Sequence, residues 1–113
     1  MLVVDPAVVE AAEEALQYYA RDAPELAERL RRGIAAALRL IELVPERGRR
    51  IPGLPVHYRR MRLAAPLPGY FFFYRIDPTY VLVFLLRHER QRPYAPHDNS
   101  SQSRRSRTTR QPR

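Results

Sequence analysis

The chain has 113 residues, which suits one domain and not two, and its 20 basic and 12 acidic side chains give a formal net charge of +8. All 20 basic residues are Arg and Cys is absent, so a disulfide framework and a cysteine-based metal site are excluded. No Arg precedes Arg21 and no apolar run reaches the roughly 18 residues of a spanning helix, so we expect a cytoplasmic protein without a secretory signal or membrane contact.

The first residues are predicted to form a short strand followed by a helix. Residues 1–4 are apolar, and Asp5-Pro6 then favours a helix start, with Asp as the N-cap and Pro at the first helical position. Apolar residues recur at helical spacing from there to about residue 20. The pattern therefore predicts a helix over 6–20.

A second helix is predicted directly after the first. Asp22 and Glu25 have the spacing of a capping box, an apolar stripe follows, and Pro45 ends the helix near Leu43. Because only a few residues separate the two helices, we expect them to form an antiparallel hairpin.

The second half of the chain has the period of strands. Residues 45–55 contain three Pro and two Gly and are predicted to be a loop. Short turns then separate three predicted antiparallel strands, at 56–63, 70–76 and 80–88. The last strand is apolar on both faces, so we expect it to lie centrally under the helices. The predicted fold is α+β in the order β-α-α-β-β-β, a two-helix N-terminal hairpin packed on a small, mainly antiparallel sheet.

Five aromatic residues in a row occupy the middle strand, from Tyr70 to Tyr74. One buried face uses only every second residue of a strand. We therefore expect part of the run to contact a partner, and the candidates are Tyr70, Phe71, Phe72 and Phe73.

The chain after about residue 95 is rich in Arg and Ser and nearly free of apolar residues. Such a segment cannot bury enough surface to offset its ordering entropy. We expect a folded domain over 1–94 and a disordered tail over 95–113. The tail either adds nonspecific affinity for nucleic acid or has no selected role.

The charge is sorted by sign along the chain. Residues 1–46 hold five Arg and nine acidic residues, a net charge of −4, whereas residues 47–113 hold fifteen Arg and three acidic residues, a net charge of +12. Segregated charge of this kind indicates a partner with many negative charges.

Four sequence segments occur in the same order as in a known group of proteins. They are LRLIELVPERGRRIPGL at the helix end, HYRRMRL in the next strand, PGYFFFYRID in the following hairpin, and the ending YVLVFLLRHERQRPY. In this order, over residues 1–94, the chain resembles the RelE/ParE superfamily of bacterial toxins. The resemblance implies a type II toxin–antitoxin system, a cognate antitoxin as partner, and neither a metal nor a cofactor.

One branch of this superfamily, the RelE-like branch, cleaves messenger RNA on the ribosome without a metal. By resemblance Arg60 and Arg62 would hold the phosphate, and His88 and Tyr94 would be catalytic. The Arg that this branch carries just after the Gly-Tyr of the middle strand is replaced by Phe71. The resemblance therefore implies a metal-independent endoribonuclease only as an alternative.

The ParE-like branch inhibits growth by binding DNA gyrase and tolerates the loss of the catalytic set, so Phe71 fits it better. The expected function is thus a ParE-like toxin, and further alternatives are an inactive toxin relic or a basic nucleic-acid-binding module. We expect Arg60, Arg62 and His88 to lie together on the open face of the sheet, which is the face away from the helices. The arginines predicted to contact phosphate or a partner are Arg59, Arg60, Arg62, Arg87, Arg90 and Arg92.

These residues also have plainer interpretations. His88 is equally consistent with a strand-end histidine that is hydrogen-bonded to backbone. Alternating Arg60 and Arg62 are equally consistent with a solvated strand face.

Overall fold

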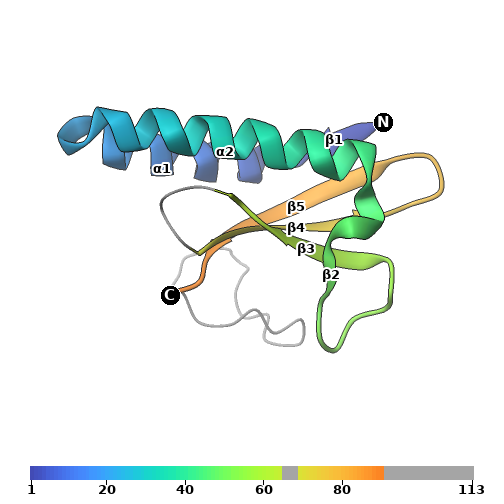
Figure 1. Ribbon diagram of the computed structural model, residues 1–113. Coiled ribbons are helices and arrows are strands. Elements are labelled where there is room, and N and C mark those ends of the chain that lie inside the picture. The colour runs from blue at the N-terminus through green and yellow to red at the C-terminus, as the bar shows by residue number, and fades with distance from the viewer. Residues whose placement is uncertain (65–68, 91–113) are drawn as a thin grey trace.

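The computed structural model describes residues 1–64 and 69–90, in which two helices cover one face of a five-stranded sheet (Figure 1). This architecture confirms the predicted α+β class and the N-terminal helical hairpin. The elements in chain order are β1 (Leu2–Val4), α1 (Pro6–Asp22), α2 (Pro24–Leu43), the single 3₁₀ turn η1 (Pro45–Arg47), β2 (Arg49–Arg50), β3 (Tyr58–Arg62), β4 (Tyr70–Ile76) and β5 (Val81–His88).

The two helices begin in different ways. Asp5 caps α1 as predicted, since its Oδ1 accepts a hydrogen bond of 2.8 Å from the Ala7 N–H. The predicted capping box at Asp22 is wrong, because Asp22 is the last residue of α1 and Ala23 occupies the cap of α2 without a side-chain hydrogen bond. Pro24 accounts for the difference, since its fixed φ and missing N–H suit the first helical position without a capping side chain.

The sheet has the order β1-β5-β4-β3-β2, with β1 parallel to β5 and the remaining pairs antiparallel. As predicted, β5 lies inside the sheet. The predicted loop at 45–55 is only partly correct, because Arg49 and Arg50 form β2 and pair with Arg60 and Arg59. The observed strands at 58–62 and 81–88 are shorter than predicted, while 70–76 agrees.

The register between β4 and β5 contains a β-bulge. Phe73 is paired with Leu85 and Tyr74 with Val83, so Phe84 is the extra residue. A bulge changes which side chains face the core on either side of it. Val83 therefore faces the helices before the bulge, and Leu86 faces them after it.

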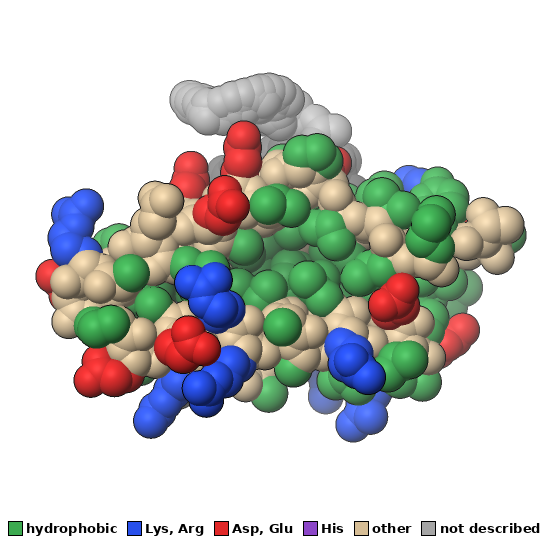
Figure 2. Space-filling view, turned by 90° about the horizontal axis from the view of Figure 1, so that it is seen from above, with side chains coloured by type: hydrophobic (Ala, Val, Ile, Leu, Met, Phe, Trp, Pro, Cys, Tyr) green, Lys and Arg blue, Asp and Glu red, His purple; other side chains and the backbone are tan. Residues whose placement is uncertain are grey.

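The core lies between the helices and the sheet. Leu30 and Ile41 of α2 pack with Val8 of α1 against the inner face of the strands. The most deeply buried strand residues, Phe72, Tyr74 and Val83, are 0% exposed. Figure 2 looks down on the helix layer and shows hydrophobic side chains along the middle of this face, with charged side chains around them.

The predicted tail at 95–113, and the last residues of the predicted domain, lie outside the described residues.

Candidate functional site

Arg60 and Arg62 of β3 lie side by side on the sheet face opposite the helices. They pair with Phe73 and Phe71 of β4, and their guanidinium carbons are 5.5 and 5.6 Å from the centroid of the Phe71 ring. Met61 lies between them and points the other way, into the core. The two arginines therefore share one face, as their spacing predicts, and the aromatic ring helps to fix both cations.

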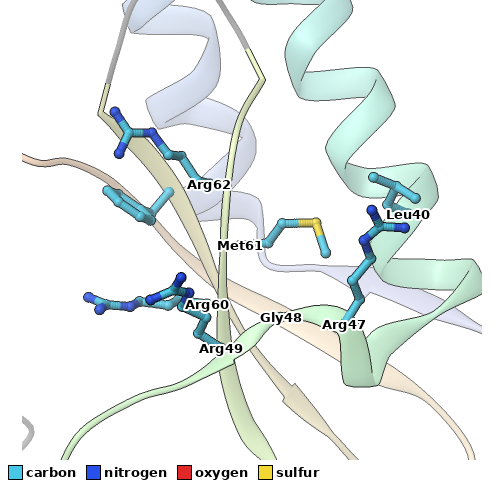
Figure 3. A pocket seen from close by; sticks show the side chains of 8 residues that line it. Leu40, Arg47, Gly48, Arg49, Arg60, Met61 and Arg62 are labelled. Atoms are coloured by element: carbon cyan, nitrogen blue, oxygen red, sulfur yellow. The ribbon is translucent and has the colours of Figure 1, made fainter.

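A pocket of about 610 Å³ adjoins this pair at the edge of the sheet. Figure 3 shows Arg49, Arg60 and Arg62 on one side of β3, and Met61 and Arg47 on the other. The pocket thus follows the strand edge and reaches both faces of the sheet. Its lining is completed by Leu40, Gly48 and Phe71.

The pocket is strongly cationic. Of its four arginines only Arg62 forms an ion pair within the described residues, at 3.8 Å from Glu89, and this pair is largely exposed. The Nε atom of Arg60 is buried and has no hydrogen-bond acceptor. Four guanidinium groups around one hollow attract anionic groups, and an unpaired buried donor adds to that preference.

Arg59, unlike the pocket arginines, uses its guanidinium group for hydrogen bonds to backbone carbonyls. Its Nε donates to the Val56 carbonyl at 2.8 Å, and its Nη1 donates to the carbonyls of Gly48 at 3.0 Å and Glu46 at 3.3 Å. The side chain therefore ties the segment before β2 to β3. Because these donors are engaged, Arg59 is a weaker candidate for phosphate or partner contact than the sequence indicates.

Tyr74 holds the same segment from inside the core. Its hydroxyl donates to the Pro45 carbonyl at 2.6 Å and accepts from the Gly48 N–H at 3.1 Å. Burial raises the pKa of Tyr74 above its ordinary value. This contact places η1 and β2, and with them Arg47 and Arg49, at the edge of β3.

We expect Tyr74→Phe to lower the free energy of unfolding by about 1–3 kcal/mol, because it leaves the buried Gly48 N–H and the partly buried Pro45 carbonyl without this partner. Urea unfolding followed by circular dichroism measures the change. Tyr18→Phe is the matched control, since Tyr18 is 74% exposed, and it is expected to stay within about 0.5 kcal/mol of the parent. Equal effects of the two variants would contradict this assignment.

His88 lies on the other face of the sheet. It pairs with Tyr70, its ring meets the Tyr70 ring edge to face at 4.8 Å, and it lines a second pocket, of about 460 Å³, against α1. Its Nδ1 accepts a hydrogen bond of 3.1 Å from the Arg90 N–H. The expectation that His88 shares the open face with Arg60 and Arg62 is therefore wrong, and the backbone-bonded interpretation describes its position.

The second pocket has a mixed lining that includes three tyrosines and Arg90. Tyr18, Tyr19 and Tyr70 line it together with Glu14 and His88. Burial and a hydrogen bond with Tyr19 raise the pKa of Tyr70 to about 12. Tyr70 therefore stays protonated at neutral pH and is a hydrogen-bonding group there.

The aromatic run divides between core and surface. Phe72 is 0% exposed and Phe73 is 5% exposed, so both side chains are buried and offer almost no surface to a partner. Phe72 faces the helices together with Tyr74. Tyr70 and Phe71 keep exposed surface, one on each face of the sheet, and remain candidates.

The remaining predicted site residues belong to β5 and to the chain that follows it. Arg87 is opposite Phe71 and thus on the open face, and Arg90 is exposed after the end of β5. Arg92 and Tyr94 lie outside the described residues, so their predicted roles stay predictions.

Arg47 and Arg49 were not among the predicted site residues. Both come from the Pro- and Gly-rich segment 45–55, which is predicted to be a loop, and both line the edge pocket. The sequence feature that could have identified them is the high number of arginines in this segment, directly before the strand that carries Arg60 and Arg62.

Within the described residues, no group of three or more His, Asp or Glu side chains is arranged to hold a metal ion. No helix in the same residues is long and apolar enough to cross a membrane.

Comparisons with known proteins agree with this fold. Residues 2–93 match the family described as the ParE toxin of the type II toxin–antitoxin system parDE. A solved structure of the chromosomal ParDE TA system from P. aeruginosa contains a chain that superposes with a TM-score of 0.60 at 14% sequence identity, over 77% of this chain and 92% of that chain. No match was found among curated protein sequences.

Proposed function

The chain belongs to the ParE toxin family of type II toxin–antitoxin systems, and from this membership we propose that it arrests growth by binding a cytoplasmic target such as DNA gyrase. In this proposal the open sheet face and the edge pocket contact the target. The toxin acts by binding and catalyses no reaction.

The separation of His88 from the arginine pair is the observation that carries the proposal. Metal-free cleavage of RNA needs a base within reach of the 2′-hydroxyl and cations on the same phosphate. Here Arg60 and Arg62 lie on one face of the sheet and His88 lies on the other. Phe71 stands where the ribonuclease branch carries another cation. Both features favour a binding toxin over the endoribonuclease alternative.

We propose that the cognate antitoxin covers the helix layer as well as the cationic half of the chain. Members of this family belong to toxin–antitoxin pairs, so a protein partner is expected. Val9 and Tyr18 of α1 and Leu43 of α2 are exposed large apolar residues. Figure 2 shows hydrophobic side chains gathered on the helix layer. Exposed apolar surface of this kind is typical of a protein–protein interface.

Controlled expression of the full chain without its antitoxin tests the proposed function. We expect growth to stop and plasmid DNA to lose supercoiling, while messenger RNA stays uncut within codons. His88→Ala is expected to arrest growth as the parent does. Cleaved messages, together with loss of toxicity in His88→Ala, would establish the ribonuclease instead. Unimpaired growth would favour the alternative that the chain is an inactive toxin relic.

A further inference from the structure

The second pocket lies between one face of α1 and the sheet. Its helical side is formed by residues at the spacing of a single helix stripe, namely Ala11, Glu14, Ala15, Tyr18 and Tyr19. The two alanines have the smallest side chains of this stripe, so they leave room between the helix and the strands. The space of about 460 Å³ therefore follows from the sequence of α1, and its volume suits a small molecule.

The sheet contributes further residues to this pocket, and the bulge in β5 determines which. Because Phe84 is the extra residue of the bulge, Leu86 and His88 lie on the helix side of the sheet. His88 is paired with Tyr70 of β4, and both rings line the pocket. Aromatic rings thus border the pocket on the helix side and on the strand side.

The rings of the second pocket are arranged as two perpendicular pairs. Tyr18 and Tyr19 meet at 86° with their centroids 5.0 Å apart, and Tyr70 and His88 meet at 83° with their centroids 4.8 Å apart. A hydrogen bond between the side chains of Tyr19 and Tyr70 connects the two pairs. Aromatic walls that face more than one direction around one space are the arrangement that recognises quaternary ammonium groups.

The polar atoms of these rings are engaged within the pocket. The hydroxyls of Tyr19 and Tyr70 pair with each other, and His88 Nδ1 accepts from the backbone N–H of Arg90. An Nδ1 that accepts belongs to an uncharged imidazole, so His88 does not repel a cation. An ammonium group with N–H bonds would find only the Glu14 carboxylate as a strong acceptor, whereas a quaternary ammonium has no N–H to satisfy.

Two opposite charges stand at the rim of the pocket. Glu14 and Arg90 are exposed lining residues, and neither forms an ion pair with another described residue. The carboxylate attracts a cation held among the rings, and the guanidinium attracts an anionic group attached to the same ligand. A ligand with one charge of each sign therefore matches this lining better than a simple cation or a simple anion.

We propose that the second pocket binds a small zwitterion of the betaine class, in which a short carbon chain joins a trimethylammonium group to a carboxylate. The trimethylammonium group lies among Tyr18, Tyr19 and Tyr70. Glu14 stands beside it, and Arg90 binds the carboxylate. The inference goes beyond the proposed function, because this site takes a small molecule and shares no lining residue with the edge pocket.

The test compares three ligands on the purified full-length chain by NMR titration of its amide signals. N,N,N-trimethylglycine is the probe, and we expect saturable binding at about millimolar concentrations that shifts the signals of Tyr18 and Tyr70. In 3,3-dimethylbutanoate a carbon atom replaces the charged nitrogen without changing the shape, and we expect binding at least about fivefold weaker. Choline lacks the carboxylate and is expected to bind at least about threefold more weakly. Equal binding of either analogue, or no saturation by the probe, would overturn the proposal.

Variants at the exposed rim test the contacts without disturbing the core. Tyr18 is 74% exposed, so Tyr18→Leu removes one ring and is expected to weaken binding of the probe about fivefold, while Tyr18→Phe keeps the ring and stays within about twofold. Arg90→Gln is expected to weaken binding of the probe about threefold and to leave binding of choline unchanged, which a merely structural role would not produce. Equal losses in the two Tyr18 variants, or an equal loss for both ligands in Arg90→Gln, would contradict these contacts.

A matched pair on α1 separates the site from general charge. Glu14→Gln is expected to weaken binding of the probe and of choline by about threefold or more. Glu13→Gln removes the same charge from the neighbouring exposed residue, which does not line the pocket, and is expected to change binding by less than about twofold. Equal effects of the two variants would overturn the role of Glu14. Neither gyrase nor growth enters these measurements, so failure of this proposal and failure of the proposed function are distinguishable.

Discussion

Replacing Phe72 by alanine is expected to lower the free energy of unfolding by about 3–5 kcal/mol. The Phe72 ring is 0% exposed and lies in the core between the sheet and the helices, so its removal leaves a cavity that the surrounding side chains fill only in part. An effect of this size is a large share of the stability of a domain this small. Urea unfolding followed by circular dichroism measures it.

Phe71→Ala is the matched control for this prediction. Phe71 is the next residue in β4, but it faces away from the helices and is only partly buried. We expect its replacement to cost about 1 kcal/mol or less. If Phe71→Ala proved as destabilising as Phe72→Ala, the assignment of the two sheet faces would be wrong.

Reversing two charges of the edge pocket is expected to abolish growth arrest. Arg49 and Arg62 are exposed, so Arg49→Glu with Arg62→Glu leaves the core intact. The change converts attraction for an acidic partner into repulsion, and we expect the affinity for the target to fall by about a hundredfold or more, which corresponds to about 2.8 kcal/mol. Growth after induction and a pull-down of the target measure the effect.

The control for the charge reversal is Arg31→Glu with Arg32→Glu on α2, which changes the net charge equally at two exposed positions. We expect this variant to remain toxic. Loss of toxicity in both double variants would show that overall charge matters and the pocket does not. Thermal unfolding of both variants verifies that each is folded.

The general architecture could be predicted from the sequence because its signals are local. The helical spacing of apolar residues, the Asp5-Pro6 start and the run of branched and aromatic residues in β5 each identify an element without knowledge of its neighbours. Pairing in the order of the chain then gives most of the antiparallel sheet.

The face on which His88 lies could not be predicted, because it depends on a non-local feature. Strict alternation from Val81 and Val83, which face the helices, would turn His88 to the open side. The bulge at Phe84 adds one residue and reverses that alternation, so Leu86 and His88 face the helices instead. No local pattern in β5 marks the bulge, since the strand is apolar on both sides of it.

The edge pocket was missed for a related reason. β2 has only two residues and lies in a segment whose Pro and Gly content is typical of a loop. Its position is determined by contacts from distant residues, namely the Tyr74 hydroxyl and the Arg59 guanidinium. The arginines of this segment become part of a site only through those contacts.

The most direct test of action by binding uses the purified full-length chain in two parallel reactions, one with DNA gyrase and relaxed plasmid, the other with translating ribosomes and a defined message. We predict that supercoiled product disappears as the toxin is added and that the message stays at full length. A message cut within its codons, beside a gyrase that still supercoils DNA at the same toxin concentration, would contradict the account.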